Sequence, residues 1–101
     1  MNLGYCSIKF FLHGNNSLKG KRKVIRTIKD RLKNKFNVSV AEVGDQEVWQ
    51  SLHLGVAAVN SDPKYLEGLL NQVVNFIDNM HLAEMTDCRK EVLRVDHHDP
   101  V

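Results

Sequence analysis

The chain lacks the features that mark membrane, secreted and zinc-binding proteins. None of its 101 residues form an apolar run near the roughly 18 to 20 residues that a membrane span needs. The N-terminus also lacks the charged-then-apolar pattern of a secretory signal. Cys6 and Cys88 lie far apart without CxxC spacing, which predicts reduced, half-buried thiols rather than a zinc site or redox pair. A disulfide stays open as an alternative if the two cysteines fall on adjacent strands. We therefore expect a soluble, cytoplasmic protein without membrane contact.

A recognisable catalytic set is absent as well. Nucleophilic catalysis needs Ser, Cys or Thr beside a base and an orienting group. The cysteines and internal histidines are Cys6, Cys88, His13, His53 and His81. Their spacing argues for no such set, so we expect no catalytic residue, no cofactor and no enzymatic activity. Imidazole and carboxylate groups gather near the C-terminus, at Asp96, His97, His98 and Asp99, but a frayed tail makes a weak metal site and none is predicted.

Alternation, helical spacing and turn residues divide the chain into six elements. Strands are predicted over 3–13, 38–43, 50–59 and 84–95. Helices are predicted from a Ser17 cap to Lys35 and from an Asp62-Pro63 start to about Asn79. The order βαββαβ is most simply satisfied by a ferredoxin-like α+β sandwich, a four-stranded antiparallel sheet with both helices on one face. We expect one domain over 1–95 and a flexible tail over 96–101.

The first helix carries an unusual share of the charge. Residues 19–35 hold nine of the fourteen Lys and Arg residues but one of the twelve acids, Asp30. This segment therefore has a net charge of +8 and the rest of the chain −6, which the total of +2 conceals. Such asymmetry indicates a polyanionic partner, with RNA as the leading candidate.

Helical geometry gathers part of this charge beside the apolar stripe, which consists of Leu18, Val24, Ile25, Ile28 and Leu32. The predicted nucleic-acid-binding arc consists of Lys19, Arg22, Lys23, Arg26, Lys29 and Lys33. The alternative interpretation is a solvated face, since Lys and Arg are good helix formers. Carboxylates four residues away are nearly absent, because only Asp30 can pair along the helix, with Arg26 or Lys33. Unpaired like charges are mildly destabilising, so a binding role would explain them.

A second candidate surface lies at the predicted hairpin after residue 43. Its members are Glu42, Asp45, Gln46, Glu47 and Trp49. Their carboxylates match no metal motif, so a solvated acidic hairpin with Trp49 against a helix end is the simplest structural interpretation. As a functional alternative, Glu42, Asp45, Gln46 and Trp49 form a protein-partner site.

The outer face of the predicted sheet offers Tyr5, Phe11 and His53. An RNA-stacking platform would need aromatics on both central strands, but 50–59 contains none and no RNP-like sequence is present. These side chains therefore indicate sheet packing or a homodimer surface, where Ser51, Gly55 and Ala57 would allow close approach.

One continuous motif is more specific than any of these patterns. Residues 36–46, Phe-Asn-Val-Ser-Val-Ala-Glu-Val-Gly-Asp-Gln, with Ser17-Leu18-Lys19, Lys21-Arg22 and Trp49-Gln50, closely resemble the bacterial YlxP-like family of unknown function. The similarity runs from Leu3 to about Leu93. It implies a small ferredoxin-like protein whose gene often lies beside those for translation initiation and ribosome maturation factors. It implies no catalytic residue.

Charge and resemblance together predict a non-catalytic RNA- or ribosome-associated binding protein that presents its first helix to phosphates. The alternative is a protein-interaction or dimerisation module that uses the outer sheet face or the hairpin from Glu42 to Trp49.

Overall fold

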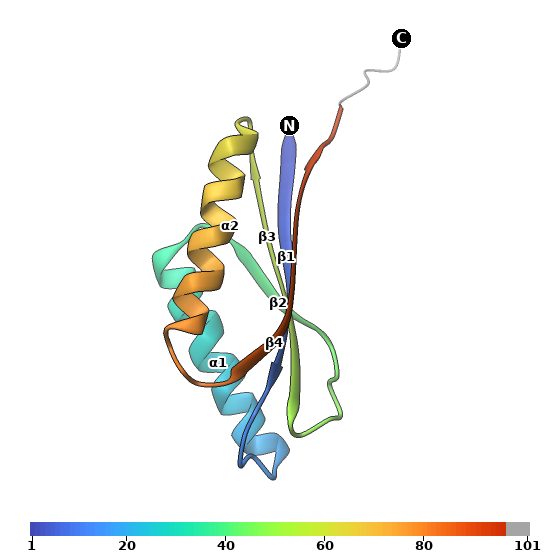
Figure 1. The fold of residues 1–101 in the computed structure, drawn as a ribbon, viewed down its shortest axis with the longest axis vertical. Coiled ribbons are helices and arrows are strands. Elements are labelled where there is room, and N and C mark those ends of the chain that lie inside the picture. Colours follow the sequence, from blue (N-terminus) through green and yellow to red (C-terminus); the bar gives the residue numbers. More distant parts are fainter. Residues whose placement is uncertain (97–101) are drawn as a thin grey trace.

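A computed structural model describes residues 1–96 of the chain. Its six elements follow the predicted order (Figure 1). They are β1 (Asn2–Phe11), α1 (Leu18–Lys35), β2 (Ser39–Gly44), β3 (Ser51–Asn60), α2 (Pro63–Asp78) and β4 (Glu84–Arg94). Among these residues, neither helix combines the length and the apolar character that crossing a bilayer requires.

The strands form one antiparallel sheet in the order β2-β3-β1-β4, and both helices cover the same face of it (Figure 1). The predicted ferredoxin-like βαββαβ sandwich is therefore confirmed. The other face, here the outer face, is covered by no element among residues 1–96. The predicted flexible tail lies outside the described residues from His97 onward; Asp96 is exposed, and its Oδ1 lies 3.0 Å from Arg94 Nε.

Alternation in β1 and β3 decides which side chains enter the core. Residues 6, 8, 10 and 12 are buried from β1 and its exit, and residues 52, 54 and 56 are buried from β3. Ile28 and Leu32 of α1, with the apolar side of α2, close over them. The apolar stripe predicted for the first helix thus packs on the core, whose burial supplies the main favourable term in folding.

Capping residues begin both helices where the sequence predicts. The Ser17 hydroxyl accepts a hydrogen bond from the Gly20 N–H at 3.0 Å, and an Asp62 carboxylate oxygen accepts one from the Lys64 N–H at 3.0 Å. Each bond satisfies one amide that the first helical turn leaves without a partner. Pro63 occupies the start of α2, where its missing N–H costs nothing.

The strand boundaries differ from the predicted ones by one or two residues, because pairing rather than composition ends a strand. The Leu12 N–H still donates to the Gln50 carbonyl at 2.8 Å beyond the end of β1. β4 is an edge strand, as its charged and irregular pattern predicts, and its register with β1 shifts between Lys9 and Phe10.

Both cysteines are free thiols. They lie on adjacent strands, since Cys88 of β4 pairs in register with Ile8 of β1, two residues from Cys6. Cys6 is fully buried rather than half-buried, and burial raises the pKa of its thiol to about 12. A thiol with so high a pKa carries little thiolate near neutral pH and is a poor nucleophile.

Candidate functional site

The six residues of the predicted nucleic-acid-binding arc lie together on the solvent side of α1. Five of them are exposed and Lys29 is half-buried. They line two adjoining shallow depressions. The first is lined by Ser17, Lys19, Gly20, Arg22, Lys23 and Arg26, and the second by Arg22, Ile25, Arg26, Lys29, Asp30, Lys33 and Glu42. Arg22 and Arg26 border both depressions, so they stand at the centre of the basic surface.

The charges of this surface are not paired with carboxylates in the part of the chain that the structure describes. Among residues 1–96, none of the six arc cations has a carboxylate oxygen within 4.0 Å, and neither do Arg31 and Lys35. Asp30 pairs with neither Arg26 nor Lys33, the partners that helical spacing offers it. Eight unpaired cations on one helix create a positive potential that attracts anions.

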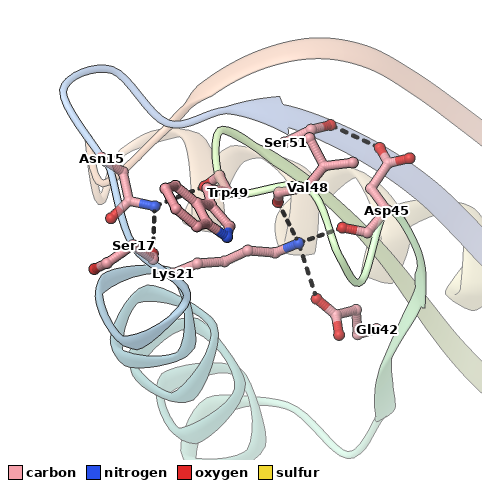
Figure 2. Close-up of polar contacts among 8 residues, drawn as sticks. All are labelled: Asn15, Ser17, Lys21, Glu42, Asp45, Val48, Trp49 and Ser51. Carbon is pink, nitrogen blue, oxygen red and sulfur yellow. Dashed lines mark hydrogen bonds and ion pairs between the residues drawn. The ribbon is translucent and has the colours of Figure 1, made fainter.

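The ninth cation of the segment, Lys21, is not part of the surface. It is 1% exposed, and its Nζ donates hydrogen bonds to the carbonyls of Asp45 and Val48, the second at 2.8 Å (Figure 2). The net charge of +8 counted for this segment therefore includes one cation, Lys21, that does not belong to the exposed surface. Helical spacing carries a signal that was missed, because Lys21 stands three residues after Leu18 and seven before Ile28 on the apolar stripe.

Glu42 of β2 provides the counter-charge for Lys21. Its Oε2 lies 3.5 Å from Lys21 Nζ, a distance for an ion pair without a hydrogen bond. The same oxygen is buried and accepts no hydrogen bond from residues 1–96. Glu42 is therefore committed to a half-buried ion pair, which corrects the prediction that it belongs to a solvated acidic hairpin. Removal of the ammonium would leave this carboxylate poorly compensated.

The β2–β3 loop, residues 45–50, holds the other predicted partner-binding residues. Asp45 turns the chain with φ of 56°, and its carboxylate accepts a hydrogen bond from the Ser51 hydroxyl at 2.6 Å. That bond is the main cause that lowers the pKa of Asp45. Gln46 and Glu47 are exposed and share a third depression with Lys21 and Arg22. The loop is thus built around Lys21 instead of projecting freely.

Trp49 lies at the end of this loop, beside the start of α1 (Figure 2). Its carbonyl accepts a hydrogen bond from Asn15 Nδ2 at 2.6 Å, and the same amide donates to the Ser17 carbonyl at 2.9 Å. The indole remains 46% exposed, so the predicted position against a helix end holds for the backbone while much of the ring faces solvent. The structure thus joins the two predicted surfaces at the N-terminus of α1.

The outer sheet face contains one contact that sequence spacing did not reveal. Ser7 Oγ and His53 Nε2 lie 2.6 Å apart across β1 and β3. A hydroxyl beside an imidazole is the first part of a nucleophilic site, but β1 is hydrogen-bonded on both sides around Ser7. Its backbone N–H groups are therefore engaged in the sheet and leave no oxyanion donors there. The arrangement is that of a cross-strand polar pair.

The two aromatic residues expected on the outer face are also engaged. The Tyr5 hydroxyl donates to Glu91, which raises the pKa of Tyr5, and the Phe11 ring meets His13 edge-on at 4.6 Å between centroids. Between residues 1 and 96, no three His, Cys, Asp or Glu side chains are placed to hold a metal ion. The histidines of the tail lie outside that range.

Comparisons with known proteins lead to the same family as the resemblance at residues 36–46. Residues 3–90 match the model of the family described as protein of unknown function DUF503. The chain belongs to this family. One relative is the uncharacterized protein YlxP of Bacillus subtilis (strain 168). It is 39% identical over 89 residues, which cover 88% of this chain and 97% of that protein. The predicted YlxP-like resemblance is thereby confirmed.

A solved structure also aligns along the whole chain. It is SnoaB, a cofactor-independent oxygenase from Streptomyces nogalater, with a TM-score of 0.49 and 8% identity over 99% of this chain and 98% of that one. At this level of similarity the alignment bears on neither the function nor the site of this DUF503 protein.

Proposed function

We propose that this protein binds RNA, in a ribosomal particle, by placing the exposed side of α1 against the phosphate backbone. The observation that carries the proposal is that the six arc cations share one side of α1 and have no ion-pair partner among residues 1–96. Phosphates supply the missing negative charge, and their counterions are released on binding. The YlxP-like resemblance, with genes beside those for translation factors, makes ribosomal RNA the first RNA to test.

Arg22 and Arg26 are the central contacts in this proposal. They border both depressions of the basic surface, and a guanidinium can bind one phosphate through two parallel hydrogen bonds. Phosphate contacts position a protein on a nucleic acid but do not read its sequence. The protein would therefore act by docking at a site of suitable shape and charge, without a chemical step.

Sedimentation with ribosomal particles tests this function directly. We expect the tagged protein to comigrate with one ribosomal subunit from its own cells at low salt and to dissociate as salt rises. Four phosphate contacts would give log K a slope near −3 against log salt, from about −0.7 to −0.9 per contact. Absence from every particle at low salt would refute the proposal, since electrostatic binding is strongest there.

A homodimer through the outer sheet face is the second candidate function. The lining of an apolar depression there includes the small residues Ser39, Ala41, Gly55 and Ala57, together with larger side chains such as Tyr5 and Val43. Beside it, the pairing places Lys9 against Asp87 and Tyr5 against Glu91, so charges of both signs line the face. A second copy, turned by a two-fold axis, could match each charge with its opposite. Both α1 helices would then remain exposed.

Light scattering during size-exclusion chromatography tests the dimer. We expect twice the monomer mass for the native chain and the monomer mass for Ala57→Glu, because a carboxylate would be buried unpaired in the contact. Arg94→Glu, which changes an exposed residue at the far end of the edge strand, should keep the dimer mass. A native chain that stays monomeric at high concentration would exclude this function.

A further inference from the structure

We propose that Trp49 stacks on an unpaired base of the RNA whose phosphates α1 binds. This inference rests on the proposed function and adds the class of RNA, a single-stranded segment such as a loop, bulge or end. The two parts are separable, because phosphate contacts are equally open to paired and unpaired RNA. A flat indole face, in contrast, can stack on a base only when that base has left the helix.

The position of Trp49 is set by hydrogen bonds on both sides. Asn15 ties its carbonyl to the first turn of α1, through bonds of 2.6 Å to Trp49 and 2.9 Å to Ser17. One residue earlier, the Val48 carbonyl accepts from the buried Lys21 ammonium at 2.8 Å (Figure 2). A ring on a loop held at two adjacent residues is preorganised, so little conformational entropy is lost when a ligand binds it.

The exposure of Trp49 calls for a partner. It is the one tryptophan of the chain and 46% of it is exposed, while the neighbouring Val48 is equally exposed. Tryptophan buries a large apolar area when it is covered, and its ring is among the best surfaces for stacking on a base. Because base stacking tolerates any of the four bases, it fits a protein whose other contacts are phosphate contacts.

The charges around the ring favour a nucleic acid over an acidic or neutral protein segment. Lys19, Arg22 and Lys23 lie in the first turns of α1, next to the loop, without ion-pair partners among residues 1–96. Of the carboxylates of the region, Glu42 is paired with Lys21 and Asp45 accepts a hydrogen bond from Ser51. Glu47 is exposed beside Arg22, and the three cations outweigh its charge. A strand that places a phosphate over Arg22 would therefore bring its base toward the indole without meeting a strong local repulsion.

Gly20 allows Asn15 to hold the loop. A Cβ at residue 20 would lie 2.2 Å from Asn15 Oδ1, so an alanine there would force the Asn15 amide to move. The displaced amide would lose its bonds to Trp49 and Ser17 while the cations of α1 stay in place. Gly20→Ala is thus a variant that loosens Trp49 without removing it, and Asn15 is a positioning residue.

The fluorescence of Trp49 provides the test, since no other tryptophan contributes to the emission. The native chain is titrated at low salt with three probes: a single-stranded RNA, a fully paired blunt-ended RNA duplex of equal charge, and inorganic polyphosphate. We expect the single strand to quench the emission, while the duplex and the polyphosphate bind without comparable quenching. Affinities of variants are measured by anisotropy of the same labelled RNAs.

Three variants then separate stacking from charge. Trp49→Ala should lower the affinity for single-stranded RNA about 5- to 100-fold. The affinity for the duplex and the salt dependence of log K should stay unchanged. Trp49→Phe, which keeps an aromatic face, should retain most of the affinity. Gly20→Ala should lower the affinity for single-stranded RNA by a smaller factor than Trp49→Ala does. Circular dichroism establishes that each variant is folded before its affinity is compared.

The outcomes distinguish this inference from the proposed function. If no RNA binds at low salt, the proposed function fails and the inference fails with it. The inference alone is overturned by a different pair of results. Single-stranded RNA then binds with a steep salt dependence but does not quench the native emission, and Trp49→Ala binds this RNA as tightly as the native chain does. A protein partner lost by Trp49→Ala, with RNA titrations unchanged, would also overturn it and assign the ring to a protein contact.

Discussion

Lys21→Met lowers the free energy of unfolding by about 3 kcal/mol, the largest stability effect we expect from a single change of a charged residue. The substitution removes hydrogen bonds to the carbonyls of Asp45 and Val48 and leaves the buried Glu42 oxygen without a cation. For a domain of this size, such a loss corresponds to a fall of about 10 to 20 °C in Tm. Thermal and urea unfolding measure it.

A neighbouring lysine supplies the matched control. Lys19→Met makes the same substitution at an exposed position that has no ion-pair partner among residues 1–96, so its effect should stay within about 0.5 kcal/mol. Adding Glu42→Leu to Lys21→Met should recover part of the loss, because the uncompensated carboxylate is then gone. Equal stabilities of the two lysine variants would show that Lys21 does not hold the β2–β3 loop in solution.

Charge reversal at Arg22 and Arg26 together weakens RNA binding by about 30-fold or more at 0.1 M salt and makes log K less steep against log salt by about 2. Each replaced guanidinium removes one phosphate contact, and each new carboxylate repels the backbone. The fold should persist, because both side chains are exposed and surface substitutions of this kind change stability little. Anisotropy titrations over a salt series measure both quantities.

The charge-matched control for this variant lies on β4. Arg89→Glu with Arg94→Glu changes the net charge by the same amount, at two exposed residues whose present contacts are Asp87 and Asp96. RNA affinity should change far less than in the α1 variant. Equal losses in both variants would mean that net charge, rather than the α1 surface, governs binding.

The architecture was largely predictable from local patterns. Ser17 caps α1, Pro63 begins α2, and the alternation in β1 and β3 separates core from outer face as the residue types require. These features depend on neighbours a few residues away, so one sequence is sufficient to recognise them. The charged edge strand β4 was predictable for the same reason. Strand ends were less so, because they depend on where a partner strand stops.

The candidate site was predictable only in part. The six arc residues were identified because a helix with few acids exposes its cations on a calculable side. Lys21 was missed as a buried residue, although its position on the apolar stripe indicates burial. The stripe alone does not reveal that two backbone carbonyls and the Glu42 carboxylate surround the Lys21 ammonium. The contact between Ser7 and His53 depends on the register of β1 with β3, which composition does not reveal.

By itself, the sequence determined the order of the elements, the composition of the core and the charge asymmetry of α1, since periodicity and composition are local properties. The tertiary structure alone decided that Lys21 is buried and that the loop of Trp49 is fastened to the N-terminus of α1. The bonds responsible join residues 24 to 34 positions apart. Such contacts form only after the sheet has brought β2 and β3 back beside α1, and no local pattern specifies which carbonyls will meet a given side chain.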